Sequence, residues 1–351
     1  MVFALVTLIA NACEAEPPRA QIQNKQLRVK FYLPDAKNGF YTGTRFDWSG
    51  VIADLEFAGH HLYQPWFACT DPAVRDFIYK DATIVAGTNS AMTGPVEEFQ
   101  TPLGYDSAKP GDSFLKVGVG LLRKADDTPY SFAKHFDLVD GGKWTIHKTA
   151  TSIIFEQVLG GPYSDYAYIY SKTIRLAGDN SELVIEHQLS NKGKLPISTK
   201  VYDHNFLTID GIGVGSAYSI TVPYKIESTR QPDAKFVKLN GSTAEYIANL
   251  QGQDRVAFGL QGFSADSKDY HFEIVNRDAK LQVTITGDHP LANASVWSIR
   301  NVLAVEPFID IQVDPGKDVI WSYKYTYART TPKDIEPVTM PRRMRSPGRH
   351  S

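Results

Sequence analysis

The chain has 351 residues, and its 37 Lys and Arg residues nearly balance its 39 Asp and Glu residues, which leaves a formal net charge of -2. No basic stripe is present in the body of the chain to attract a phosphate backbone, so we do not expect a nucleic acid partner. Aromatic residues make up 12% of the sequence, and 26 Gly and 20 Pro residues supply turns, which favours many short strands over long helices.

Residues 1–15 have the pattern of a signal peptide. The first twelve are almost entirely apolar and end in Ala10-Asn11-Ala12, which is typical of an export cleavage site. No Lys or Arg precedes this stretch, so the signal is incomplete, and a lipidated Cys13 is the alternative. We expect a periplasmic or secreted protein. No other apolar run reaches the roughly 20 residues of a membrane-spanning helix, so no membrane span is expected.

The body of the chain has the alternation of strands. Residues 27–33 alternate apolar and polar side chains, which predicts a half-buried strand. The best helix candidate is 71–80, where Asp71 could cap and Pro72 could occupy the first helical position. Further along, 168–176 with 181–189 and 272–275 with 281–285 predict two hairpins, because each pair flanks turn residues. These elements predict an all-β protein built from long antiparallel sheets.

The chain shows no internal repeat and no Gly/Ser-rich linker. We therefore predict a single domain over residues 23–329. Residues 330–351 contain several Pro and Arg residues without apolar periodicity, which predicts a disordered basic tail. Cys13 and Cys69 are the only cysteines, and cleavage of the signal would leave one thiol and no internal disulfide.

Two separated motifs offer acid and base groups within strand-like sequence. His204 lies in Tyr202-Asp203-His204-Asn205-Phe206, and Glu306 lies in Ala304-Val305-Glu306-Pro307. An imidazole and a carboxylate have ordinary pKa values of about 6.5 and 4.3, so the two can hold opposite protonation states near neutrality. Each also has a structural interpretation: a core histidine bonded to backbone, and a paired carboxylate at a strand end.

Together with the sequence C-terminal to Glu306, the two motifs resemble the catalytic His and Glu of the aldose 1-epimerases, the galactose mutarotase family. The run Val313-Asp314-Pro315-Gly316-Lys317 and the alternation of Val319, Trp321, Tyr323, Tyr325 and Tyr327 match the end of that family's domain, and residues 45–52 resemble its opening strands. The resemblance covers nearly the whole domain. It implies a β-supersandwich of large twisted antiparallel sheets, a sugar or glycan as the partner, and no cofactor.

The resemblance also implies roles. Glu306 would remove the proton from the anomeric hydroxyl and His204 would protonate the ring oxygen, with the imidazole pKa raised by the neighbouring carboxylate. One segment departs from the family. Where mutarotases carry a basic and amide-containing motif, this chain has Gly94-Pro95-Val96-Glu97-Glu98-Phe99.

Six further residues are candidates for substrate binding. Charged groups with several hydrogen-bonding atoms suit a polyol, and a flat apolar ring can stack on a pyranose. Structural pairing or core packing is the alternative for each. The candidates are Arg45, Glu97, Glu98, Arg300, Trp66 and Trp297. The histidines His60, His61, His135 and His147 show no metal-ligand spacing, so no metal site is predicted.

The leading hypothesis is a cofactor-free sugar epimerase of the aldose 1-epimerase type. The first alternative is a carbohydrate-binding protein that kept the fold and lost turnover. The second is a polysaccharide lyase or hydrolase that recruits Glu97 or Glu98 as a further acid/base group, since one fold hosts many chemistries. The deciding observation is whether Glu306 and His204 face each other in one polar pocket.

Overall fold

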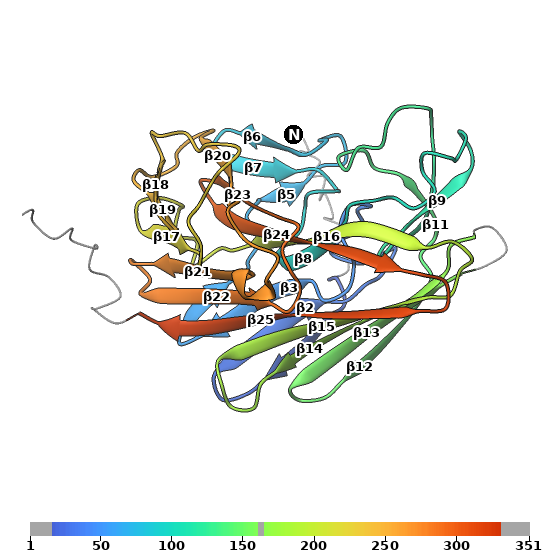
Figure 1. Cartoon of the computed structure of the whole chain (residues 1–351), viewed down its shortest axis with the longest axis horizontal. Coiled ribbons are helices and arrows are strands. Elements are labelled where there is room, and N and C mark those ends of the chain that lie inside the picture. Colours follow the sequence, from blue (N-terminus) through green and yellow to red (C-terminus); the bar gives the residue numbers. More distant parts are fainter. Residues whose placement is uncertain (1–15, 161–164, 331–351) are drawn as a thin grey trace, which may run out of the picture.

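The computed structural model describes residues 16–160 and 165–330, and strands dominate it (Figure 1). The only helical element in this part of the chain is a three-residue 3₁₀ turn, Ser267–Asp269, and no helix in these ranges could cross a membrane. The all-β prediction is confirmed. The predicted signal peptide lies outside the described residues, as does the tail beyond Thr330.

The largest sheet has ten strands, each antiparallel to its neighbours. In spatial order they are β12 (Lys143–Lys148), β13 (Ser152–Leu159), β14 (Tyr168–Leu176), β15 (Glu182–Asn191), β25 (Asp318–Arg329), β22 (Leu281–Gly287), β21 (His271–Asn276), β17 (Tyr218–Thr221), β19 (Thr243–Tyr246) and β18 (Val237–Asn240). Both predicted hairpins are confirmed, as β14–β15 and β21–β22. The strict alternation of burial along β14 explains why its sequence was informative.

A five-stranded antiparallel sheet carries the residues of the candidate site. Its order is β20 (Arg255–Gly259), β23 (Asn293–Ile299), β24 (Val302–Val313), β16 (Ile197–Phe206) and β8 (Gly94–Phe99). One face of this sheet packs against the ten-stranded sheet, where the Phe99 ring lies 5.4 Å from that of Tyr170 and 6.2 Å from that of Trp321. The other face is therefore available for a site.

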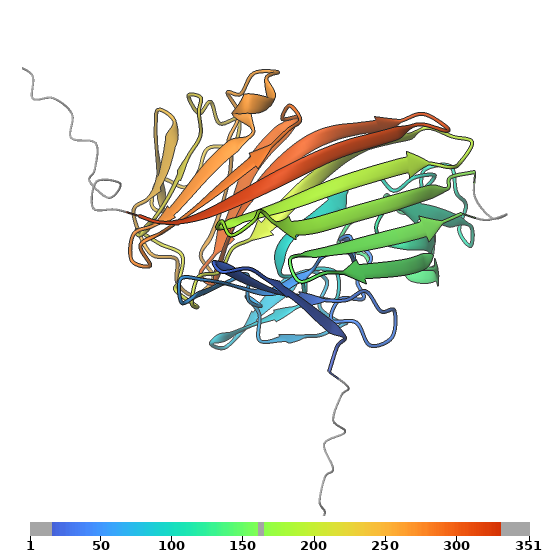
Figure 2. The same ribbon diagram turned by 90° about the horizontal axis from the view of Figure 1, so that it is seen from below.

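Three smaller sheets complete the described part. They are β1 (Arg19–Gln23), β2 (Leu27–Tyr32), β3 (Ile52–Phe57) and β4 (His60–Leu62); β11 (Asp137–Asp140), β10 (Gly120–Arg123) and β9 (Ser113–Lys116); and β5 (Cys69–Thr70), β7 (Thr83–Ala86) and β6 (Phe77–Lys80). Strand β2 confirms the strand predicted over 27–33. Figure 2 shows β1 and β2, in dark blue, beneath the long green strands of the ten-stranded sheet.

The helix predicted over residues 71–80 is wrong. Its proposed cap, Asp71, instead accepts a hydrogen bond from the Ala73 amide at 2.9 Å within a turn, and the segment ends as strand β6. In β6 the side chains of Phe77 and Tyr79 alternate inward, and the Phe77 ring packs 5.8 Å from that of Trp297. Tertiary aromatic packing with a period of two therefore overrides the local helix signals.

Candidate active site

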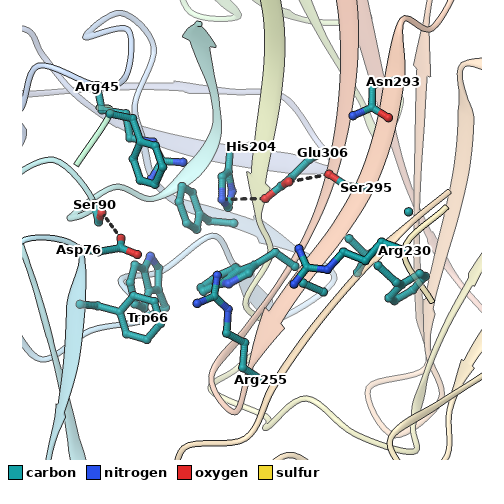
Figure 3. Close-up of a pocket in the computed structure, with 18 of the residues that line it drawn as sticks. Arg45, Trp66, Asp76, Ser90, His204, Arg230, Arg255, Asn293, Ser295 and Glu306 are labelled. Atoms are coloured by element: carbon teal, nitrogen blue, oxygen red, sulfur yellow. Dashed lines mark hydrogen bonds and ion pairs between the residues drawn. The ribbon is translucent and has the colours of Figure 1, made fainter. Parts of the chain in front are cut away.

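Strand register brings His204 and Glu306 together. In the β16–β24 pair Tyr202 lies opposite Phe308, and the same antiparallel register continued by two residues places His204 across from Glu306. The His204 Nε2 atom lies 3.1 Å from Oε1 of Glu306. On the other side of β24, Ser295 of β23 pairs with Glu306, and its hydroxyl donates to Oε2 at 2.8 Å (Figure 3). Three neighbouring strands thus fix the pair.

The pair lies in the wall of a cavity of about 420 Å³ on the face of the five-stranded sheet that points away from the ten-stranded sheet. Its lining combines aromatic rings, three arginines, and amide, hydroxyl and carboxylate groups. It comprises Arg45, Trp66, Asp76, Phe77, Ser90, Phe132, His204, Phe206, Thr229, Arg230, Arg255, Ala257, Phe258, Gly259, Gln261, Asn293, Ser295, Val296, Trp297 and Glu306. This mixture of ring faces and convergent polar groups is typical of small-molecule sites.

The imidazole of His204 is in an apolar setting. Its ring stacks on Phe206 with centroids 3.7 Å apart and meets the edge of Phe46 at 5.8 Å. Nδ1 is buried and makes no hydrogen bond, so the proton belongs on Nε2, the nitrogen that lies next to Glu306. Burial, with the charge of Arg45, holds the pKa of His204 well below its ordinary value. The expectation that this pKa is raised is therefore wrong, because burial and the charge of Arg45 both disfavour the charged imidazolium.

The pKa of the Glu306 carboxylate is shifted in the opposite direction. Burial raises its pKa, and the hydrogen bond from Ser295 and the charge of Arg45 only partly oppose this. Its side chain keeps 16% of its surface exposed, against 6% for His204, so a ligand in the cavity can reach it. A carboxylate with a raised pKa is a stronger base than an ordinary one.

Arg45 reaches the cavity from a fixed position. Its Nε donates to Oε2 of Glu98 at 2.7 Å, and its guanidinium donates to the Tyr202 hydroxyl at 2.8 Å. The guanidinium lies between the rings of Phe46 and Phe132, 4.4 and 4.1 Å from their centroids. Glu98 itself does not line the cavity. It holds the side chain of Arg45, and Arg45 lines the cavity.

Glu97 points the other way. Successive side chains of a strand face opposite sides, and β8 pairs Glu97 with Asp203 and Glu98 with Tyr202. Glu97 is fully buried between the two large sheets, where it forms an ion pair with Lys172 and contacts Nε2 of His187 at 2.7 Å. The structure therefore places Glu97 away from the cavity.

Arg300 also lies outside the cavity lining. Its guanidinium donates to the carbonyl of Ala82 at 2.8 Å and stacks over the Tyr79 ring at 5.0 Å. These contacts connect the turn between β23 and β24 to the β6–β7 hairpin. Arg300 therefore has a structural role in the fold.

Both candidate tryptophans line the cavity, but they differ in what they present to it. Trp66 is 3% exposed, its indole N–H donates to the Met92 carbonyl at 3.0 Å, and its ring stacks on Phe206. Trp297 is half-buried and meets its aromatic neighbours mainly at their edges. Trp297 therefore offers the better ring surface for a sugar.

Several lining residues were absent from the sequence-based candidates. Ser295 could have been found by pairing β23 with β24, since the hairpin register sets it opposite Glu306. Arg230, Arg255 and Asp76 come from a loop or strand ends, and no motif marks them. Among the described residues, no group of three His, Cys, Asp or Glu side chains is placed to hold a metal ion.

No protein-family model and no curated protein matches the sequence. By structure, the chain is similar to the Slr1438 protein from Synechocystis sp. PCC 6803, with a TM-score of 0.53 and 12% identity over 93% of this chain and 100% of that one. It is similar to a putative aldose 1-epimerase from Escherichia coli K12, with a TM-score of 0.53 and 9% identity over 89% and 99% of the two chains. A galactose mutarotase-like protein from Clostridium acetobutylicum gives 0.51 and 11% over 89% and 95%. The chain thus has the galactose mutarotase-like fold, which confirms the predicted fold class.

Proposed function

We propose that the protein is a cofactor-free sugar epimerase of the aldose 1-epimerase type. The observation that carries the proposal is the meeting of His204 and Glu306, 3.1 Å apart, in the wall of one cavity of about 420 Å³. The two side chains come from strands about one hundred residues apart in sequence, yet they match the acid and base that the sequence resemblance implies. The fold similarity supports the same assignment.

Mutarotation needs both groups at one carbon. The anomeric hydroxyl and the ring oxygen are attached to the same atom, so a base and an acid whose tips lie close together can serve both. Glu306 takes the hydroxyl proton, the bond from C1 to the ring oxygen breaks, and C1 becomes a carbonyl carbon. As that bond breaks, Nε2–H of His204 donates a hydrogen bond to the ring oxygen, and the proton that Glu306 has taken passes to that oxygen. Rotation of the aldehyde and closure on the other face give the second anomer.

One proton moves in this step, from the anomeric hydroxyl through Glu306 to the ring oxygen. Because Glu306 gives up the proton that it took, neither side chain holds an additional charge once the ring is open. A neutral His204, as its lowered pKa requires, can serve as the hydrogen-bond donor to the ring oxygen. Arg45 lines the same cavity and can hydrogen-bond a substrate hydroxyl, while Trp297 offers its ring to the apolar face of the sugar.

The lyase or hydrolase alternative is less well supported. It required Glu97 or Glu98 as a second acid/base group, since glycoside cleavage commonly uses two carboxylates flanking the scissile bond. Glu97 is buried between the sheets, and Glu98 is bound to Arg45, Tyr202 and Lys116. Neither lines the cavity.

The test is the interconversion of anomers in freshly dissolved sugars, followed by polarimetry or proton NMR. Glu306→Gln keeps the shape of the side chain but removes the proton acceptor, so the rate should fall by more than about 10²-fold, as is typical of a lost acid/base group. In His204→Asn the rate should fall nearly as far. Glu273→Gln, at a half-exposed carboxylate outside the cavity, is the matched control.

Calorimetry on the same variants separates catalysis from binding. We expect Glu306→Gln to keep most of its affinity for the sugar. A wild-type protein that binds a sugar and leaves its mutarotation at the background rate would favour the carbohydrate-binding alternative. Unchanged turnover in Glu306→Gln would rule out the proposed mechanism.

A further inference from the structure

Two arginines in the cavity form no ion pair. Arg230 and Arg255 both line it, both are exposed, and neither forms an ion pair with any described residue. Figure 3 shows both side chains extending toward the space in front of His204 and Glu306. Arg45 differs, because Glu98 already balances its charge at 2.7 Å. An arginine pair with no carboxylate within ion-pair distance, inside a cavity, is available to a ligand.

The backbone that carries the two arginines is fixed. Arg255 is the first residue of β20 and pairs with Ile299 of β23. Arg230 lies in the connection between β17 and β18, and its carbonyl accepts a hydrogen bond from the Gly259 amide at the other end of β20, at 3.1 Å. The loop is therefore bonded to the same strand that carries Arg255, so the backbone of both arginines is held by β20, which forms part of the cavity wall.

The charge around the cavity favours an anion at this wall. Asp76 lies on the opposite side in Figure 3, where its carboxylate accepts a hydrogen bond from Ser90 and forms no ion pair with either arginine. The whole chain has a formal net charge of -2, so this concentration of positive charge is local and does not reflect a basic protein. A guanidinium presents a planar array of donors that matches carboxylate and phosphate oxygens.

We propose that the substrate is an anionic sugar, whose carboxylate or phosphate group is bound by Arg230 and Arg255 while its anomeric carbon faces His204 and Glu306. This inference rests on the proposed function for the orientation of the sugar. The charge of Arg255 acts on Glu306 and lowers its pKa, which agrees with Arg255 and the catalytic pair sharing one site. The volume of about 420 Å³ lies within the range of single small-molecule sites.

The experiment compares neutral and anionic sugars on the full chain. Glucose and galactose form the neutral arm, glucuronate and galacturonate the carboxylate arm, and glucose 6-phosphate the phosphate arm. Calorimetry should show at least one anionic arm binding about tenfold or more tightly than the neutral arm, with an affinity that falls as salt rises. The arm that binds more tightly than the neutral sugars shows whether the anionic group is a carboxylate or a phosphate.

Variants assign the gain to the arginines. Arg230→Gln and Arg255→Gln should each weaken binding of the anionic sugar by about tenfold. The affinity for the neutral sugars should stay the same. Arg28→Gln removes the same charge from an exposed side chain on β2, outside the cavity. It should change neither the affinity for the anionic sugar nor that for the neutral sugars.

The outcomes separate this inference from the proposed function. Equal affinity of neutral and anionic sugars, absence of binding by every anionic sugar, or equal losses for both classes in the arginine variants would overturn the inference. If neutral aldoses are then still interconverted with dependence on Glu306, the proposed function stands alone. If anionic sugars bind through the arginines but are not interconverted, the arginine pair stands as an anion-binding site and the proposed function fails.

Discussion

At the scale of single residues, the opposite pKa shifts of His204 and Glu306 have one chemical effect. Burial lowers the pKa of the imidazole and raises that of the carboxylate. Each shift favours the uncharged form of its group. The imidazole therefore stays neutral near pH 7 and keeps Nε2–H as a hydrogen-bond donor, while Glu306 is a stronger base than an ordinary glutamate. The apolar rings around His204 contribute the burial that keeps it neutral.

These shifts predict a pH profile with an acid limb and no alkaline limb from His204. Glu306 must be ionised to act as the base, and its pKa is raised, so activity should fall as the pH drops through a value above that of an ordinary glutamate. The pKa of His204 is lowered, so the imidazole is already neutral near pH 7 and loses no further proton on the alkaline side. The measurement is the anomerisation rate against pH, corrected for buffer catalysis.

Ser295→Ala provides an internal control for that profile. The Ser295 hydroxyl lowers the pKa of Glu306, so its removal should shift the acid limb to higher pH and leave the alkaline plateau in place. An alkaline fall that disappears in His204→Asn would contradict the assignment of a neutral imidazole.

At the scale of elements, strand alternation assigns two adjacent glutamates to different tasks. On β8, Glu98 faces the cavity side and holds Arg45, while Glu97 faces the ten-stranded sheet and meets Lys172 of β14. Lys172 also contacts Asp47 at 2.6 Å, so one buried ammonium serves two carboxylates. Although burial alone would raise it, the charges of Lys172 and His187 lower the pKa of Glu97 to about 2.

Removing that ammonium should be costly. Lys172→Met leaves Glu97 and Asp47 buried without their cation, and breaking a buried pair in this way typically costs 3–5 kcal/mol, so we expect a loss of about that size in the free energy of unfolding. Urea denaturation followed by circular dichroism measures it. Lys25→Met, whose side chain is 77% exposed in its pair with Asp179, is the control and should leave the midpoint unchanged. A loss below about 1 kcal/mol in Lys172→Met would show that the network is not required for stability.

The elements also show which features a sequence can reveal. The hairpins β14–β15 and β21–β22 were predictable because alternation and turn residues are local signals. Motif and resemblance selected His204 and Glu306, but their contact depends on the register of β16 against β24, which is a tertiary property. The direction of Glu97 depends on register in the same way. Arg230 is placed by a loop whose hydrogen bond to Gly259 leaves no pattern in the sequence.

At the scale of the whole molecule, the chain order and the sheet order interlock. The last described strand, β25, lies between β15 and β22. The two parts of the largest sheet are therefore joined only when the end of the described chain is in place. The preceding strand, β24, carries Glu306 and pairs with both β16 and β23. Strands β15 and β16 and, about one hundred residues later, β22 and β23 therefore depend on the same C-terminal pair.

This arrangement predicts one cooperative unit. Far-ultraviolet circular dichroism should show a strand-dominated spectrum, and its thermal transition should coincide with that of tryptophan fluorescence, because Trp321 reports the ten-stranded sheet and Trp297 the cavity. A chain ending at Asn301 would lack β24 and β25, leave β15 and β22 without their shared partner, and should not fold. A chain ending at Thr330 keeps every described strand and should unfold as the full protein does. Two separated transitions, or a folded chain ending at Asn301, would mean that parts of the chain fold independently of β24 and β25, and the single domain predicted over residues 23–329 would have to be divided.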